Sequence, residues 1–120
     1  MNLLDTMTNW SGSAYDTAGH NHKRNFHLRG KKHLRELADE LGFTREGAKI
    51  RSCKGGIAVS GEVTLHADYL YVCISHNYAY FRVCNGRKDY SGGKNYNFDP
   101  LLLTIPSSLA IFIRNTIKHL

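Results

Sequence analysis

The densest group of chemically capable side chains lies in the segment 85–95, which reads Asn-Gly-Arg-Lys-Asp-Tyr-Ser-Gly-Gly-Lys-Asn. An arginine can bind a phosphate or carboxylate through two parallel N–H bonds, whereas a lysine offers a point charge. The Gly-Gly pair permits close backbone approach, and exposed N–H groups there can form an anion nest. We expect a binding site here, formed by Arg87, Lys88, Asp89, Tyr90 and Lys94. The alternative is a structural loop in which Asp89 pairs with Arg87 or caps a turn.

A second group precedes this loop, where polar and apolar residues alternate from Glu62 to Val83. Such alternation is typical of strands that bury one face of a sheet. Tyr71, Tyr80 and Arg82 fall on the polar face, which is therefore a candidate binding surface. It can stack on single-stranded nucleic acid or form a homodimer. The alternative is that these side chains only stabilise the sheet through cross-strand pairs.

A third group is a run of cations. Ten Lys and Arg residues and four Asp and Glu residues lie between His20 and Lys54, a balance of 10 − 4 = +6 that equals the whole formal net charge of +6. Lys31, Lys32 and Arg35 are the candidate phosphate-binding residues of this run. The alternative is a solvated helix face beside a flexible arm.

Catalytic and metal-binding motifs are weak by comparison. His20, His22 and His27 form a cluster without paired cysteines or HExxH spacing, so we predict no metal site and no cofactor. No Walker pattern, nucleophile elbow or paired-carboxylate motif occurs. A second hypothesis is nevertheless a small nucleotide- or phosphodiester-acting enzyme. Its candidate residues would be Glu62, His66, Arg82, Arg87 and Asp89.

The elements that must position these groups follow from hydrophobic periodicity. A stripe of leucines and an alanine predicts a helix over residues 31–41, and Pro106 opens a second amphipathic helix. Four strands are expected between them, at 48–53, 57–66, 69–75 and 78–84. The predicted fold is α+β: an antiparallel sheet of about four strands with two helices packed on one face, in the order α-β-β-β-β-α.

Two-residue turns fix the expected register. A turn at Ala67-Asp68 pairs Leu65 with Leu70, and a turn at 76–77 pairs Val72 with Phe81. Both turns place one apolar set on the same face, and a slip of one residue would break that agreement. The apolar face then comprises Val63, Leu65, Leu70, Val72, Ile74, Phe81 and Val83.

Length and composition limit the class of protein. A chain of 120 residues predicts a single domain, placed at residues 26–120. Residues 1–25 contain few aliphatic residues and no sustained period, so we expect a flexible N-terminal arm there. No run of about 18 apolar residues occurs, so we expect no membrane partner. Three cysteines without CxxC spacing, and an N-terminus without a basic signal region, favour a cytoplasmic location.

Three strings carry a resemblance: 60–66 (SGEVTLH), 70–72 (LYV) and 84–95 (CNGRKDYSGGKN). They are similar to a group of small uncharacterised bacterial, phage and plasmid proteins with an SGEV-type strand and a GRKDY-(S/T)-GG loop. The resemblance covers about the middle third of the chain and implies a phage or mobile-element context. It implies no mechanism.

The sequence therefore predicts a small basic binding module that binds nucleic acid or a nucleoprotein complex, for example as an inhibitor of a host defence system. The first alternative is the small enzyme described above. The second is a structural protein that self-associates through its tyrosine-rich sheet face.

Overall fold

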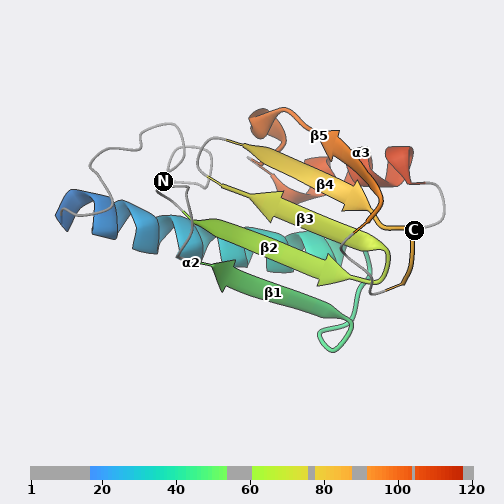
Figure 1. The fold of residues 1–120 in the computed structure, drawn as a ribbon, viewed down its shortest axis with the longest axis horizontal. Helices are drawn as coiled ribbons and strands as arrows, with labels where there is room; N and C mark the ends of the chain where they lie inside the picture. Colours follow the sequence, from blue (N-terminus) through green and yellow to red (C-terminus); the bar gives the residue numbers. More distant parts are fainter. Residues whose placement is uncertain (1–16, 54–60, 76–77, 88–91, 104, 118–120) are drawn as a thin grey trace.

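The computed structural model describes residues 17–53, 61–75, 78–87, 92–103 and 105–117 (Figure 1). Within these residues the chain forms two α-helices and one antiparallel sheet of five strands in the order β1-β2-β3-β4-β5. Both helices lie behind the sheet in Figure 1, so they cover the same face, and the predicted α+β class is confirmed. The elements are α2 (Thr17–Glu40), β1 (Ala48–Cys53), β2 (Glu62–Ala67), β3 (Leu70–Ile74), β4 (Ala79–Val83), β5 (Lys94–Asn97), the 3₁₀ turn η1 (Pro100–Leu103) and α3 (Pro106–Thr116).

The helix α2 begins well before the predicted residue 31 and includes part of the segment expected to be a flexible arm. The predicted helix began at residue 31 because its apolar stripe begins at Leu34, and residues 1–25 contain few aliphatic residues and no sustained helical period. In the structure Gly30 is buried where α2 crosses β2, and a Cβ added there would lie 3.0 Å from Val63 Cγ2. Gly30 therefore allows the helix to approach the sheet closely. The boundary of the domain at residue 26 stays a prediction.

The β3–β4 register is confirmed: Val72 lies opposite Phe81. The β2–β3 register differs by two residues, because Leu65 lies opposite Val72 instead of Leu70. The turn consists of Asp68-Tyr69, and Asp68 has a φ of 53°, a left-handed conformation that aspartate adopts more readily than most residues. A shift of two residues keeps every side chain on its own face, so the face assignment holds.

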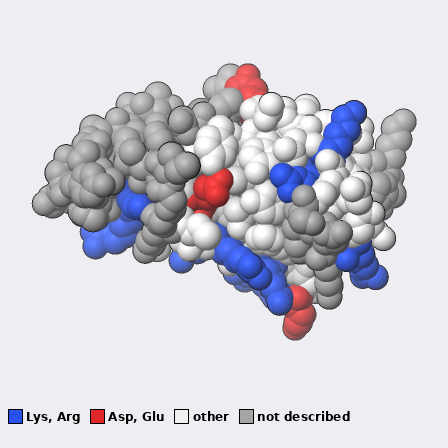
Figure 2. Space-filling model, in the orientation of Figure 1, with Lys and Arg blue, Asp and Glu red and all other residues white. Residues whose placement is uncertain are grey.

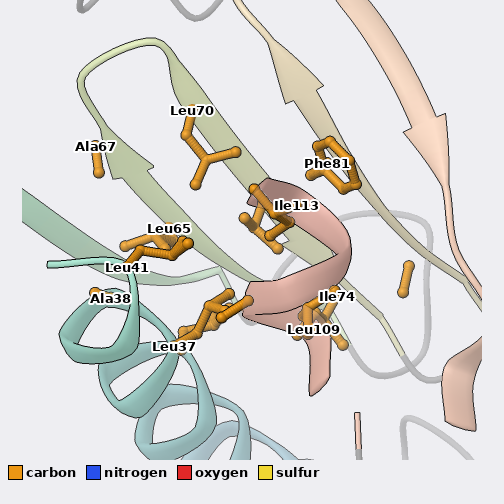
Figure 3. Close-up of a cluster of buried hydrophobic side chains, with 14 of the residues drawn as sticks. Leu37, Ala38, Leu41, Leu65, Ala67, Leu70, Ile74, Phe81, Leu109 and Ile113 are labelled. Carbon is orange, nitrogen blue, oxygen red and sulfur yellow. The ribbon is translucent and has the colours of Figure 1, made fainter. Parts of the chain in front are cut away.

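The core lies between the sheet and the two helices (Figure 3). Leucines from α2 and residues from α3 meet the apolar face of β2, β3 and β4 there. Phe81 is fully buried, and its ring lies 5.9 Å from the Phe112 ring and 5.2 Å from the Tyr96 ring. Of the predicted apolar face, Val83 alone is only partly buried.

The fifth strand was expected to be loop. β5 pairs with β4 so that Lys94 lies opposite Val83. Gly93 precedes it with a φ of 126°, and a Cβ on that residue would lie 2.1 Å from the carbonyl oxygen of Val83. Only glycine fits this approach, so Gly93 lets the chain return beside β4.

The helix α3 begins at Pro106, as predicted, and buries Leu109, Ala110 and Ile113. Arg114 donates a hydrogen bond of 2.6 Å to the carbonyl oxygen of Glu40, which joins α3 to the C-terminal end of α2. Among the described residues, no helix combines the length and apolar character needed to cross a membrane.

The packing at Gly30 leads to a prediction about stability. A Gly→Ala change inside an exposed helix raises the free energy of unfolding by about 1 kcal/mol. We expect Gly30→Ala to lower it by about 1 kcal/mol instead, because the methyl group presses on the stiff, buried Val63. Denaturant unfolding measures the change. In a Val63→Ala background the same substitution should become neutral or stabilising; a gain in stability with Val63 present would show that the contact is not tight.

A buried histidine leads to a second prediction. His33 on α2 is 6% exposed, and its Nε2 has no hydrogen-bond partner within the described structure. Burial lowers its pKa from 6.5 to about 4. Between these values the unfolded chain binds a proton that the folded His33 does not bind, so stability is lost as the pH falls through this range.

We expect His33 alone to remove about 3 kcal/mol of unfolding free energy between pH 6.5 and pH 4. The measurement is urea unfolding at both pH values for the wild type and His33→Leu. The variant should show the smaller acid loss. Equal acid losses in the two proteins would contradict the prediction.

Candidate functional site

The surface of the sheet opposite α2 and α3, here called the open face, carries two rows of side chains that cross all five strands. Strand pairing places Lys49, His66, Tyr71, Arg82 and Asn95 in the first row. The second row consists of Arg51, Thr64, Cys73, Tyr80 and Asn97. Each row begins with a cation on β1 and ends with an amide on β5.

The first row is connected by direct contacts. The Arg82 guanidinium lies 5.3 Å from the centre of the Tyr71 ring, within the range of a cation–π interaction. Arg82 Nε also donates a hydrogen bond of 2.6 Å to Asn95 Oδ1. On the other side of Tyr71, the His66 ring meets it edge to face at 5.0 Å. These contacts orient the Tyr71 ring from both neighbouring strands.

The tyrosines form a continuous group on the open face. The ring centres of Tyr71 and Tyr80 are 6.1 Å apart, and Tyr80 stacks on Tyr78 at 6.3 Å. Tyr78 donates its hydroxyl proton to the Glu62 carboxylate. The buried Cys73 thiol donates to the same carboxylate over 3.0 Å. The Glu62 carboxylate therefore accepts hydrogen bonds from both Tyr78 and Cys73.

Burial determines the charges on this face. It raises the pKa of the Tyr71, Tyr78 and Tyr80 phenols above their ordinary value, at which they are already neutral at physiological pH. Burial, followed by repulsion from Arg51, lowers the pKa of His66. Figure 2 views the open face: its described part is largely uncharged, with Lys and Arg side chains both along the margin where β1 lies and over the sheet itself.

The predicted loop residues do not all join the open face. Arg87 donates a hydrogen bond to Asp68 in an exposed ion pair, so it links the chain after β4 to the β2–β3 turn. Lys94 lies on the helix side of the sheet, where its Nζ is 5.2 Å from the centre of the Tyr96 ring. Lys94 is therefore on the opposite face of the sheet from Tyr71, Tyr80 and Arg82. Lys88, Asp89 and Tyr90 lie outside the described residues.

The predicted cations of the first helix lie elsewhere again. Lys31, Lys32 and Arg35 belong to α2, whose buried stripe packs against the other face of the sheet. Lys31 and Lys32 are exposed, and Arg35 is partly exposed. The structure thus separates the predicted site residues into an open-face group (Tyr71, Tyr80, Arg82) and an α2 group.

The open face also gains residues that the sequence analysis did not place in the site. Lys49 and Arg51 were counted only as part of the basic run, although alternation along 48–53 puts them on one face. Asn97 was assigned to no site, and the neighbouring Asn95 was assigned to a loop. Their position depends on β5, which the sequence signals only weakly.

Three residues of the enzyme hypothesis, Glu62, His66 and Arg87, form hydrogen bonds with different partners, and Asp89 lies outside the described residues. Glu62 binds Tyr78 and Cys73, whereas Arg87 binds Asp68. His66 shares a hydrogen bond of 2.9 Å with Thr64. Within the described part of the chain, no group of three His, Cys, Asp or Glu residues is placed to hold a metal ion.

Comparisons with the known protein families, with curated proteins and with solved structures found no match to this chain.

The position of the cysteines gives a prediction about thiol reactivity. Burial and the Glu62 carboxylate raise the pKa of Cys73 to about 12, and the thiolate is the reactive form. Cys84 is also buried, whereas Cys53 is exposed. In the folded protein, iodoacetamide at mildly alkaline pH should modify Cys53 far faster than Cys73 or Cys84. Peptide mass spectrometry measures the three rates, with denatured protein as the control; equal native rates at Cys53 and Cys73 would contradict the structure of the open face.

Proposed function

We propose that the protein binds single-stranded nucleic acid on the open face of its sheet. The observation that carries this proposal is the pair of cross-strand rows, which bring stacking rings and cations together on one surface. Proteins that bind single strands without strong sequence preference combine the same two elements: aromatic rings that stack on bases and cations that follow the phosphates.

The tyrosines supply the stacking part of this interface. Their phenols are neutral, and Tyr71 and Tyr80 are partly exposed. Contacts with Arg82 and His66 hold the Tyr71 ring in place, so little side-chain freedom is lost when a base stacks on it. Stacking on an aromatic ring contributes about 1–3 kcal/mol per base.

The cations supply the electrostatic part. Lys49 and Arg51 begin the two rows, and both side chains are exposed on β1. Arg82 lies near the other end, beside Tyr71. Neutralising phosphates with such residues releases counterions, so the affinity should fall as the salt concentration rises.

Matched substitutions test the proposal. We expect Tyr71→Leu to weaken binding of a short single-stranded oligonucleotide by about 1–3 kcal/mol with little change in salt dependence. Arg82→Gln should weaken binding and also flatten the salt dependence. Lys94→Gln removes the same charge from the other side of the sheet and serves as the control. Fluorescence anisotropy at several salt concentrations measures all three.

The control also defines the contrary result. If Lys94→Gln weakens binding as much as Arg82→Gln, the effect reflects net charge and not the open face. If the wild type binds no oligonucleotide at low salt but forms a salt-resistant dimer that Tyr71→Leu disrupts, the open face is a self-association surface. Either result would overturn the proposal.

A further inference from the structure

The outward side of α2 carries a second, separate surface. Arg24, Leu28, Lys31, Lys32 and Arg35 follow one another at intervals that fall on one side of a helix, and we call them the α2 stripe. The buried residues Leu34 and Leu37 lie on the opposite side of the same helix. The α2 stripe therefore faces away from the sheet and does not belong to the open face.

An exposed leucine distinguishes this stripe from an ordinary charged helix face. Leu28 is 58% exposed, whereas Leu34 and Leu37 are fully buried. It occupies the middle of the stripe, one turn from Arg24 and one turn from Lys31. A single exposed leucine is common on protein surfaces, but one ringed by cations offers an apolar contact together with a fixed charge pattern.

Lys31, Lys32 and Arg35 give the stripe a local excess of positive charge. Between Thr17 and Arg35 the helix contains six Lys and Arg residues and no Asp or Glu. Lys31, Lys32 and Arg35 form no ion pair with other described residues. Asp39, one turn beyond Arg35, is paired with Arg45 at 3.6 Å. Lys31, Lys32 and Arg35 therefore keep the stripe positive, although Glu36 lies one turn from Lys32.

We propose that the α2 stripe docks an acidic protein segment that carries an apolar side chain for Leu28. A phosphate backbone would engage the cations but leave Leu28 in water, whereas an acidic amphipathic helix satisfies both. Complementary charge would steer the encounter, and burial of Leu28 would add affinity at its centre. Because the stripe and the open face lie on opposite layers, both can be occupied at once.

The test uses the full chain and three probes: a helical peptide of Glu with Leu spaced at every third or fourth residue, the same peptide with Ala in place of Leu, and duplex DNA. We expect the Glu/Leu peptide to bind more tightly than the Glu/Ala peptide. Leu28→Ser should weaken the Glu/Leu peptide about tenfold and leave the Glu/Ala peptide unchanged. Ile111→Ser, at an equally exposed apolar residue on α3, is the matched control and should change neither affinity.

The charge part is tested with Lys31→Gln/Lys32→Gln, which should weaken both peptides and flatten their salt dependence. A melting curve confirms that each variant is folded. The proposal is overturned if the wild type does not discriminate between the two peptides, or if Leu28→Ser leaves the Glu/Leu affinity unchanged. It is also overturned if duplex DNA binds more tightly than either peptide and only the lysine variant weakens it, because the stripe would then be a phosphate site.

Discussion

The burial of one face of the sheet is the constraint on which the rest of this structure depends. Side chains alternate along a strand, so placing Val72 and Phe81 beneath the helices forces Tyr71, Tyr80 and Arg82 to the other side. Each large apolar side chain buried in the core contributes about 1.5–3 kcal/mol. A slip of one residue in β3 or β4 would turn several of these apolar side chains toward water and remove their contributions to stability. The composition of the open face is therefore a consequence of the core.

Much of this fold could be predicted because the hydrophobic pattern is strict where the core forms. The β3–β4 register followed from alternation and turn length alone, and the start of α3 followed from Pro106. The N-terminal part of α2 was missed because residues 17–25 contain no sustained apolar stripe, and the packing of Gly30 against Val63 is a contact between distant segments. The strand β5 was missed because it is short and polar. The position of β5 depends on the close approach of the Gly93 backbone to the Val83 carbonyl. A pattern of neighbouring residues in the sequence cannot predict such a contact.

The candidate site was predicted less completely, because some of its residues are placed by contacts between distant parts of the chain. Alternation placed Tyr71, Tyr80 and Arg82 on one surface, because that inference needs only the face of each strand. Arg87 pairs with Asp68, 19 residues away in the sequence, a contact that no local pattern indicated. The face on which Lys94 lies could be assigned only once β5 was known to pair with β4. This pairing places the Lys94 side chain on the helix side of the sheet. Groups that share a face can be read from a sequence, whereas contacts between distant segments require the fold.

The central claim is that ligand and core occupy opposite faces of one sheet. The most direct measurement is an NMR titration of the protein with a short single-stranded oligonucleotide, followed through side-chain signals. The account predicts shifts at the Tyr71 and Tyr80 rings, the Arg82 Nε and the Asn95 amide, while the signals of Tyr96 and Phe112 stay in place. Shifts confined to the lysines and arginines of α2, with the tyrosine rings of the open face unmoved, would contradict it.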